Sequence, residues 1–235
     1  MRKPSSYPIV VISGLLACLF AVSCERQAAQ SQQLENQQPG MAVRGEGLPF
    51  YSGADLTPRW PPSLTTSSRD FHRIPPFRFT NQEGKQITDE TFRGKIYVAD
   101  FFFTGCGGIC PVMTKNLAKV QEAFASDEDL LILSHSVTPE KDNVEMLKGY
   151  ADLKGVRNGK WHLVTGDRNE IYKLARKSYF ADDSSGSGGS DFVHSERLFL
   201  IDRDRRIRGV YSGTLAFDVV RLISDIKTLK TEGGS

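Results

Sequence analysis

In the last two thirds of the chain, the spacing between hydrophobic positions changes several times. Runs such as 85–88 alternate every second residue, which is typical of strands with one buried face. The run 96–103 is almost continuously apolar, as a central strand buried on both faces should be. Elsewhere apolar residues recur at spacings of three and four, as in Leu117, Val120 and Phe124, which predicts helices packed on a sheet.

The predicted elements alternate between strand and helix and then end in a hairpin and a closing helix. This order indicates one α/β domain of three layers, with helices on both faces of a mixed sheet. The predicted strands occupy 77–80, 85–88, 96–103, 130–134, 161–164, 197–202 and 207–211, and the predicted helices run from the loop 104–111 to about 124 and over 141–151, 169–178 and 217–229.

Residues 1–23 have the features of a bacterial lipoprotein signal peptide. A basic start precedes the apolar run 9–22, which is short for a membrane span but suits the core of a signal. Small residues then lead to Cys24, as at the cysteine that becomes the lipid-bearing N-terminus of a lipoprotein. Cys18 fits the same local pattern, but the apolar run continues beyond it. We therefore expect export and lipid attachment at Cys24, on the periplasmic side of a bacterial membrane, with an ordinary secretory signal as the alternative.

Two further segments precede the globular pattern. Residues 24–45 are rich in Gln, Ala and Ser and offer almost nothing to bury, so we expect a disordered tether. Residues 46–76 are rich in proline and predict an extended, irregular arm that packs against a domain spanning 77–231. The apolar side chains expected to make this packing are Leu48, Phe50, Tyr51, Leu56 and Trp60.

Composition narrows the class of protein in two ways. The 30 basic and 28 acidic residues are intermixed and give a net charge of +2, so no footprint for nucleic acid is expected. With Cys18 in the signal and Cys24 lipidated, the four cysteines leave only Cys106 and Cys110 in the domain. One close pair does not make a disulfide scaffold, and it is interpreted as a functional site.

Cys106 and Cys110 lie where a strand–helix loop is predicted to meet the start of a helix, with Pro111 in the first turn. The positive end of a helix lowers the pKa of a thiol and makes it a better nucleophile and a better metal ligand. A spacing of one helical turn suits either a shared ion or a reversible disulfide. Two thiolates favour soft metals, above all Cu(I). Asp100, in the preceding strand, either poises these thiols or is a hydrogen-bonded core carboxylate.

A third ligand would have to come from elsewhere in the fold. The candidates are His72, His135, His162 and His194. His194 lies between the Gly/Ser-rich segment 182–190 and the strand 197–202, a junction that thioredoxin-like sheets place beside the active-site loop. His135 ends a strand at the same predicted edge and is a minor candidate. The other two histidines are interpreted as structural.

Three ordered motifs resemble the Sco/SenC family over residues 70–230. They are FFFTGCGGICP at 101–111, SVTPEKD at 136–142 and FVHS at 192–195. The chain departs from the family pattern at Gly107 and Gly108, where many members have a proline and an acidic residue. Loss of that acid is expected to weaken copper affinity or to favour thiol exchange.

The resemblance implies a thioredoxin-like fold and a membrane-attached, extracytoplasmic protein that binds copper through Cys106, Cys110 and His194. It also implies delivery of copper to the binuclear copper site of cytochrome c oxidase, or maintenance of that site in reduced form. The partner is then the copper-binding oxidase subunit or another extracytoplasmic copper protein. The alternative is a dedicated thiol–disulfide oxidoreductase in which Cys106 attacks and Cys110 resolves. A thiol peroxidase and a structural zinc site are both weaker hypotheses.

Overall fold

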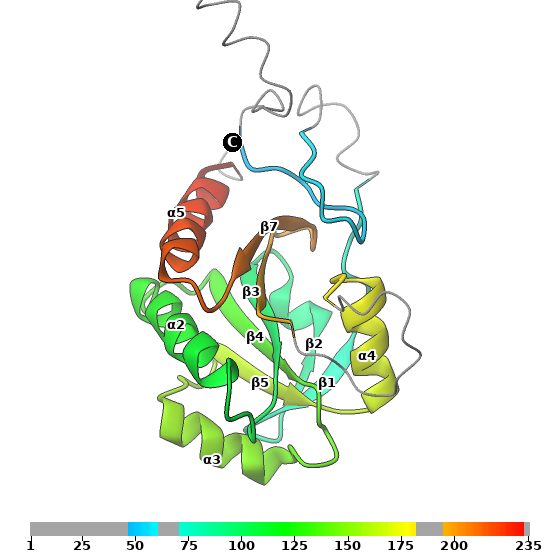
Figure 1. The fold of residues 1–235 in the computed structure, drawn as a ribbon, viewed down its shortest axis with the longest axis vertical. Helices are drawn as coiled ribbons and strands as arrows, with labels where there is room; N and C mark the ends of the chain where they lie inside the picture. Colours follow the sequence, from blue (N-terminus) through cyan, green and yellow to red (C-terminus); the bar gives the residue numbers. More distant parts are fainter. Residues whose placement is uncertain (1–46, 61–70, 182–194, 233–235) are drawn as a thin grey trace, which may run out of the picture. The chain divides into compact units, whose positions relative to one another are not determined.

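The computed structural model describes residues 47–60, 71–181 and 195–232, which contain a mixed sheet of seven strands in the order β2-β1-β5-β4-β3-β6-β7 (Figure 1). The three central strands, β3 to β5, are parallel, whereas β1, β2, β6 and β7 pair antiparallel with their neighbours. The strands are β1 (Arg78–Asn81), β2 (Gln86–Thr88), β3 (Ile96–Phe102), β4 (Leu130–Ser136), β5 (Trp161–Thr165), β6 (Arg197–Ile201) and β7 (Ile207–Ser212). The helices are η2 (Asp89–Phe92), α2 (Cys110–Ala123), α3 (Val144–Lys154), α4 (Arg168–Lys177) and α5 (Ala216–Glu232).

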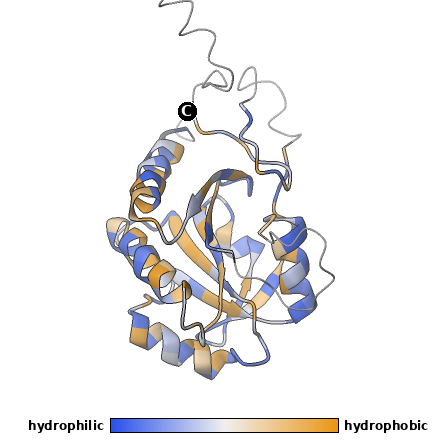
Figure 2. Ribbon diagram, in the orientation of Figure 1, coloured by the Kyte–Doolittle hydropathy of each residue, from blue (hydrophilic) through white to orange (hydrophobic). Residues whose placement is uncertain are grey.

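Helices cover both faces of the sheet and give the expected three layers. Helix α4 packs on one face, and α2, α3 and α5 pack on the other (Figure 1). Strand β3 is buried along its whole length. Its residues Tyr97, Ala99 and Phe101 belong to the core under α4, and Val98 and Phe102 belong to the core under α2. Figure 2 shows the apolar strands between helices that carry polar residues as well. The predicted α/β class with a mixed sheet is therefore confirmed.

The start of α3 differs from the prediction, which began this helix at 141. The helix begins at Val144 because the side chain of Asn143 accepts a hydrogen bond from the amide of Met146 and caps the first turn. The residues before Asn143 instead form a turn in which the amides of Lys141 and Asp142 donate to the carbonyl of Thr138. A side-chain cap of this kind sets the boundary more sharply than apolar spacing does.

Residues 47–60 form an arm that lies along β7. Phe50 is buried to 5% exposure, and its ring stacks on that of Phe71 with centroids 4.3 Å apart. The amide of Tyr51 donates to the carbonyl of Ile207 at 3.0 Å, so the arm extends the sheet by an isolated antiparallel bridge. The arm thus occupies part of the edge of β7, which would otherwise present unpaired backbone groups.

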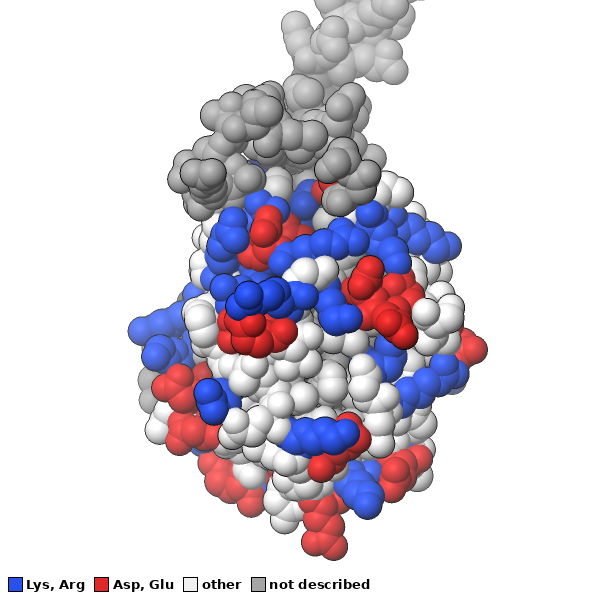
Figure 3. Space-filling view, turned by 180° about the vertical axis from the view of Figure 1, so that it is seen from behind, with Lys and Arg blue, Asp and Glu red and all other residues white. Residues whose placement is uncertain are grey.

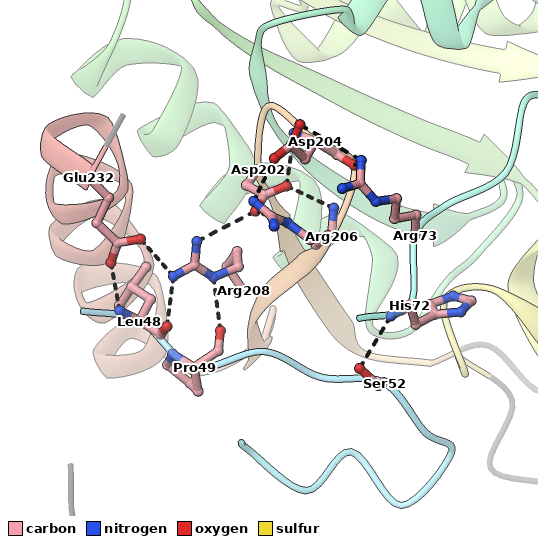
Figure 4. Close-up of polar contacts among 10 residues, drawn as sticks. All are labelled: Leu48, Pro49, Ser52, His72, Arg73, Asp202, Asp204, Arg206, Arg208 and Glu232. Carbon is pink, nitrogen blue, oxygen red and sulfur yellow. Dashed lines mark hydrogen bonds and ion pairs between the residues drawn. The ribbon is translucent and has the colours of Figure 1, made fainter. Parts of the chain in front are cut away.

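The guanidinium of Arg208, on β7, holds the arm against the domain (Figure 4). It donates to the backbone carbonyls of Leu48 at 2.7 Å and Pro49 at 3.1 Å. It also pairs with Glu232 of α5 at 2.6 Å, and that carboxylate accepts a hydrogen bond from the amide of Leu48. The guanidinium carbon lies 4.0 Å from the ring centroid of Phe50, which adds a cation–π contact. One buried cation therefore joins the arm, β7 and α5.

Acidic and basic side chains are interspersed on the face shown in Figure 3. Some ion pairs join residues distant in sequence, for example Arg205 with Asp89 at 2.6 Å. Within the described ranges, no helix combines the length and the apolar character needed to cross a bilayer.

Candidate functional site

The two domain cysteines lie at the junction between β3 and α2, as predicted. Cys110 is the first residue of α2 and is 1% exposed, whereas Cys106, in the loop before it, is half-buried. Both are free thiols. Gly107 and Gly108 are exposed, and a side-chain carbon added to either would meet no atom within 4 Å. The loop therefore leaves open space next to the half-buried thiol.

The two thiols have opposite acidities. Burial by itself would raise the pKa of Cys106, but hydrogen bonds from the Cys110 thiol and from the backbone amides of Cys110, Gly108 and Ile109 outweigh it and lower the pKa. Burial, followed by the hydrogen bond with Cys106, raises the pKa of Cys110 to about 12. The helix N-terminus therefore stabilises one thiolate, at Cys106, and leaves the other cysteine protonated in the metal-free protein.

This asymmetry predicts selective alkylation. Iodoacetamide at pH 7.5 should modify Cys106 at least tenfold faster than Cys110, because Cys106 is the more accessible thiol and has the lowered pKa, whereas the pKa of Cys110 is raised to about 12. The sign follows from the two pKa shifts: raising the pH ionises Cys106 first, and Cys110 stays a thiol through the physiological range. Peptide mass spectrometry after timed quenching measures both rates, and equal rates would contradict the assigned acidities.

Asp100 is a buried residue of β3, the strand that leads into the cysteine loop. Its carboxylate accepts a hydrogen bond from Ser134, whose hydroxyl oxygen accepts another from the indole N–H of Trp161 at 2.9 Å. It is thus a hydrogen-bonded core residue, and burial raises its pKa to about 7. When ionised, Asp100 also contributes to the raised pKa of Cys110. The acid therefore disfavours a thiolate at Cys110.

His194 lies outside the described residues, but the described segment that follows it begins close to α2, the helix that carries Cys110. Ser195 is buried, and the carbonyl of Glu196 accepts a hydrogen bond from the amide of Gly213 at 2.6 Å. A side-chain carbon added to Gly213 would come within 3.0 Å of Met113, which lies on α2 three residues after the second cysteine. The start of β6 is therefore packed against the first turns of α2. Cys18 and Cys24 also lie outside the described residues.

His135 is fully buried on the other face of the sheet. Its ring stacks on Phe101 with centroids 4.8 Å apart, under α4, whereas Cys110 packs in the core under α2. Its Nδ1 lies 3.2 Å from the carbonyl of Asp100. The minor hypothesis that His135 is a ligand at the dithiol edge is therefore wrong, because the strand alternation points the ring away from the cysteines.

The remaining two described histidines are structural, as predicted. His162 is buried, and its Nδ1 lies 3.3 Å from the side-chain nitrogen, Nδ2, of Asn81. His72 is half-buried, and its Nε2 lies 2.8 Å from the carbonyl of Ser178. Within residues 47–60, 71–181 and 195–232, no group of three or more His, Cys, Asp and Glu side chains is arranged to hold a metal ion.

Asp142 is a residue of the site region to which the sequence interpretation gave no role. Its carboxylate is 1% exposed and accepts hydrogen bonds from Thr104, two residues before Cys106. The available signal was its place in the second motif, 136–142, which ends at this aspartate. A contact across 38 residues could not be inferred from that position alone.

A thioredoxin-like α/β domain with a dithiol at the start of a helix defines a class of redox and metal-binding proteins, and the comparisons identify the family. The SCO1/SenC family profile matches residues 65–231, and the chain belongs to this family. A SCO1 protein homolog of Bacillus subtilis strain 168 is 32% identical over 162 residues, which cover 68% of this chain and 84% of the relative.

Solved structures show the same relationship. BsSco, described as a member of the Sco family of cytochrome c oxidase assembly proteins with a disulfide switch, is 32% identical, with a TM-score of 0.59 over 68% of this chain and 94% of that one. A SCO1/SenC family lipoprotein from Bacillus anthracis is 31% identical, with a TM-score of 0.61 over 72% and 99% of the two chains. Bradyrhizobium japonicum ScoI, solved with copper bound, is 25% identical, with a TM-score of 0.54 over 67% and 99%.

Proposed function

We propose that this protein is a membrane-anchored copper chaperone that carries one Cu(I) ion on Cys106, Cys110 and His194. The observation that carries the proposal is the dithiol itself: two free cysteines, one helical turn apart, at the N-terminus of α2 beside an open glycine loop. Two sulfur donors suit Cu(I), and a third donor completes a trigonal site that leaves room for an incoming ligand. The copper-bound relative from Bradyrhizobium supports the choice of metal.

His194 is proposed as the third ligand because of the position of the described residues that follow it in the sequence. Strand β6 pairs antiparallel with β3 through Val98 and Leu200, and it begins at the end of β3 that leads into the cysteine loop. Glu196 precedes this strand and is hydrogen-bonded to Gly213, next to α2. His194 precedes Glu196 by two residues in the sequence, so we propose it as the third ligand in preference to the three described histidines.

The proposed cellular setting follows from the N-terminal sequence and from the relatives. Lipid attachment at Cys24 would hold the domain at the periplasmic face of a bacterial membrane, with residues 24–45 as the tether and 77–231 as the copper-binding domain; the Bacillus anthracis relative is described as a lipoprotein. The proposed recipient is the binuclear copper site of cytochrome c oxidase, since BsSco belongs to a family of assembly proteins for this enzyme.

Competition with a chromophoric Cu(I) chelator tests the proposal on the reduced, full-length protein. We expect one Cu(I) per chain and a loss of at least tenfold in affinity for His194→Ala, equivalent to about 1.4 kcal/mol or more. His135→Phe is the matched control, since that ring lies on the opposite face of the sheet among other aromatic rings, and it should leave the affinity unchanged. Absence of stoichiometric binding, or equal affinity in the wild type and His194→Ala, would refute the proposed site.

The second candidate function is thiol–disulfide exchange, and one observation favours it. The lowered pKa of Cys106 and the raised pKa of Cys110 are the pattern of an attacking and a resolving thiol. The disulfide switch described for BsSco is consistent with such chemistry. A strongly reducing dithiol together with copper binding that is indifferent to His194 would favour this function over the chaperone.

A further inference from the structure

A buried carboxylate ties together the two loops that follow β3 and β4. Asp142 accepts hydrogen bonds from the backbone amide of Thr104 at 3.2 Å, from the hydroxyl of Thr104, from the hydroxyl of Ser136 and from the hydroxyl of Thr138 at 3.0 Å. These four donors come from the loop after β3, from the end of β4 and from the loop after β4, and all are neutral. A carboxylate can accept four or more hydrogen bonds, so this environment satisfies it without a cation.

The contacts of Asp142 reach the dithiol through Thr104. Thr104 lies two residues after the end of β3 and two residues before Cys106, in a loop that also contains the exposed Gly105, Gly107 and Gly108. On the other side, Asp142 lies directly before Asn143, which caps α3. The carboxylate therefore connects the start of α3 to Thr104, which precedes the glycines of the cysteine loop.

We infer that Asp142 is a positioning residue, which sets the conformation of the cysteine loop so that the Cys106 thiol stays directed at Cys110. The glycines allow this loop many backbone conformations. The hydrogen bonds between Thr104 and Asp142 reduce the number of these conformations before any ligand binds. The consequence for copper rests on the proposed function, whereas the consequence for thiol exchange does not. Both follow because a bridging ion and a disulfide each require the two sulfurs to be close.

The test compares Asp142→Ala with Asp142→Asn in the full-length protein. We expect Asp142→Ala to lower Cu(I) affinity at least tenfold. The second readout is the equilibrium between the protein dithiol with oxidised glutathione and the protein disulfide with two reduced glutathiones. We expect Asp142→Ala to shift this equilibrium at least tenfold toward the dithiol, equivalent to ~30 mV. Asp142→Asn should restore most of both values, because its carbonyl oxygen still accepts from the Thr104 amide and its NH₂ can donate to the neighbouring hydroxyls.

Asp202→Asn is the matched control for a general loss of stability. Asp202 is also buried, at 4% exposure, and also organises a turn by accepting from the amides of Asp204 and Arg206 (Figure 4). It follows β6, whose last residue, Ile201, pairs with Tyr97 near the start of β3, the end opposite the cysteine loop. Its replacement should lower stability and leave the dithiol equilibrium unchanged.

Unchanged thiol exchange in Asp142→Ala, or an equal shift in Asp202→Asn, would overturn the inference. If Asp142→Ala does not fold, Thr104→Val replaces it, since this variant removes one hydroxyl donor and keeps the backbone amide. It should shift the glutathione equilibrium in the same direction by at least threefold, and no shift would overturn the inference. A wild-type protein that binds no copper would refute the proposed function alone, because the glutathione measurement needs no metal.

Discussion

Replacing Arg208 with methionine should lower the free energy of unfolding by about 3–5 kcal/mol, because the change leaves buried polar groups without their partner. The Arg208 side chain is only 6% exposed and lies between the carboxylates of Asp202 and Glu232. The same guanidinium supplies the hydrogen bonds to the carbonyls of Leu48 and Pro49. Methionine keeps the apolar contact with the arm and removes all of these donors. Urea unfolding followed by tryptophan fluorescence measures the loss.

Arg93→Met is the matched control for this variant. Arg93 also pairs with a glutamate, Glu90, but the two side chains are 76% and 58% exposed, and exposed pairs contribute little to stability. Its urea midpoint should therefore stay at the wild-type value. Hydrogen exchange should also show faster exchange at the amides of Leu48 and Tyr51 in Arg208→Met alone. Equal stability of the two variants would show that the arm does not depend on Arg208.

The second large effect is a pair of opposite pH dependences inside the core. Burial raises the pKa of Asp100 from 3.8 to about 7, and burial lowers the pKa of His135 from 6.5 to about 4. The folded state therefore holds both groups neutral between about pH 4 and 6.5, where the unfolded chain would ionise both. Asp100 stabilises the fold fully below its unfolded pKa, and this contribution is lost as the pH rises to about 7. His135 stabilises the fold above pH 6.5, and this contribution is lost as the pH falls to about 4.

Single variants should separate the two contributions, which nearly cancel in the wild type. In Asp100→Asn the aspartate dependence is removed, so stability relative to wild type should rise by about 3 kcal/mol between pH 4 and 6.5. In His135→Phe the histidine dependence is removed, so stability relative to wild type should fall by about 3 kcal/mol between pH 4 and 7. Phenylalanine suits this site because the ring already lies among Phe101, Phe79 and Tyr179.

Urea unfolding at intervals of half a pH unit measures these slopes, and comparison with the wild type removes the contribution of the exposed carboxylates. The reduced protein is used, because Cys110 stays protonated throughout this range and adds no slope of its own. Two variants with the same pH dependence as the wild type would show that neither group is held neutral in the folded state.

The sequence alone determined the order of the elements, the α/β class and the place of the dithiol. Apolar periodicity reports burial directly, so the continuous run at 96–103 predicted β3 within one residue of its observed end. The spacing of Cys106 and Cys110 next to Pro111 likewise located the start of α2, because local chemistry governs a helix N-terminus. The family was also indicated by the three motifs and is shown by the family match.

The tertiary structure alone decided which polar groups meet. The hydrogen bonds of Thr104 with Asp142 span 38 residues, and that of Arg208 with Leu48 spans 160. It also assigned His135 to the face of the sheet away from the cysteines, because register fixes which residues of a strand share a face. Periodicity records whether a side chain is buried, whereas its partner depends on how distant segments pack, and that information is carried by the whole fold.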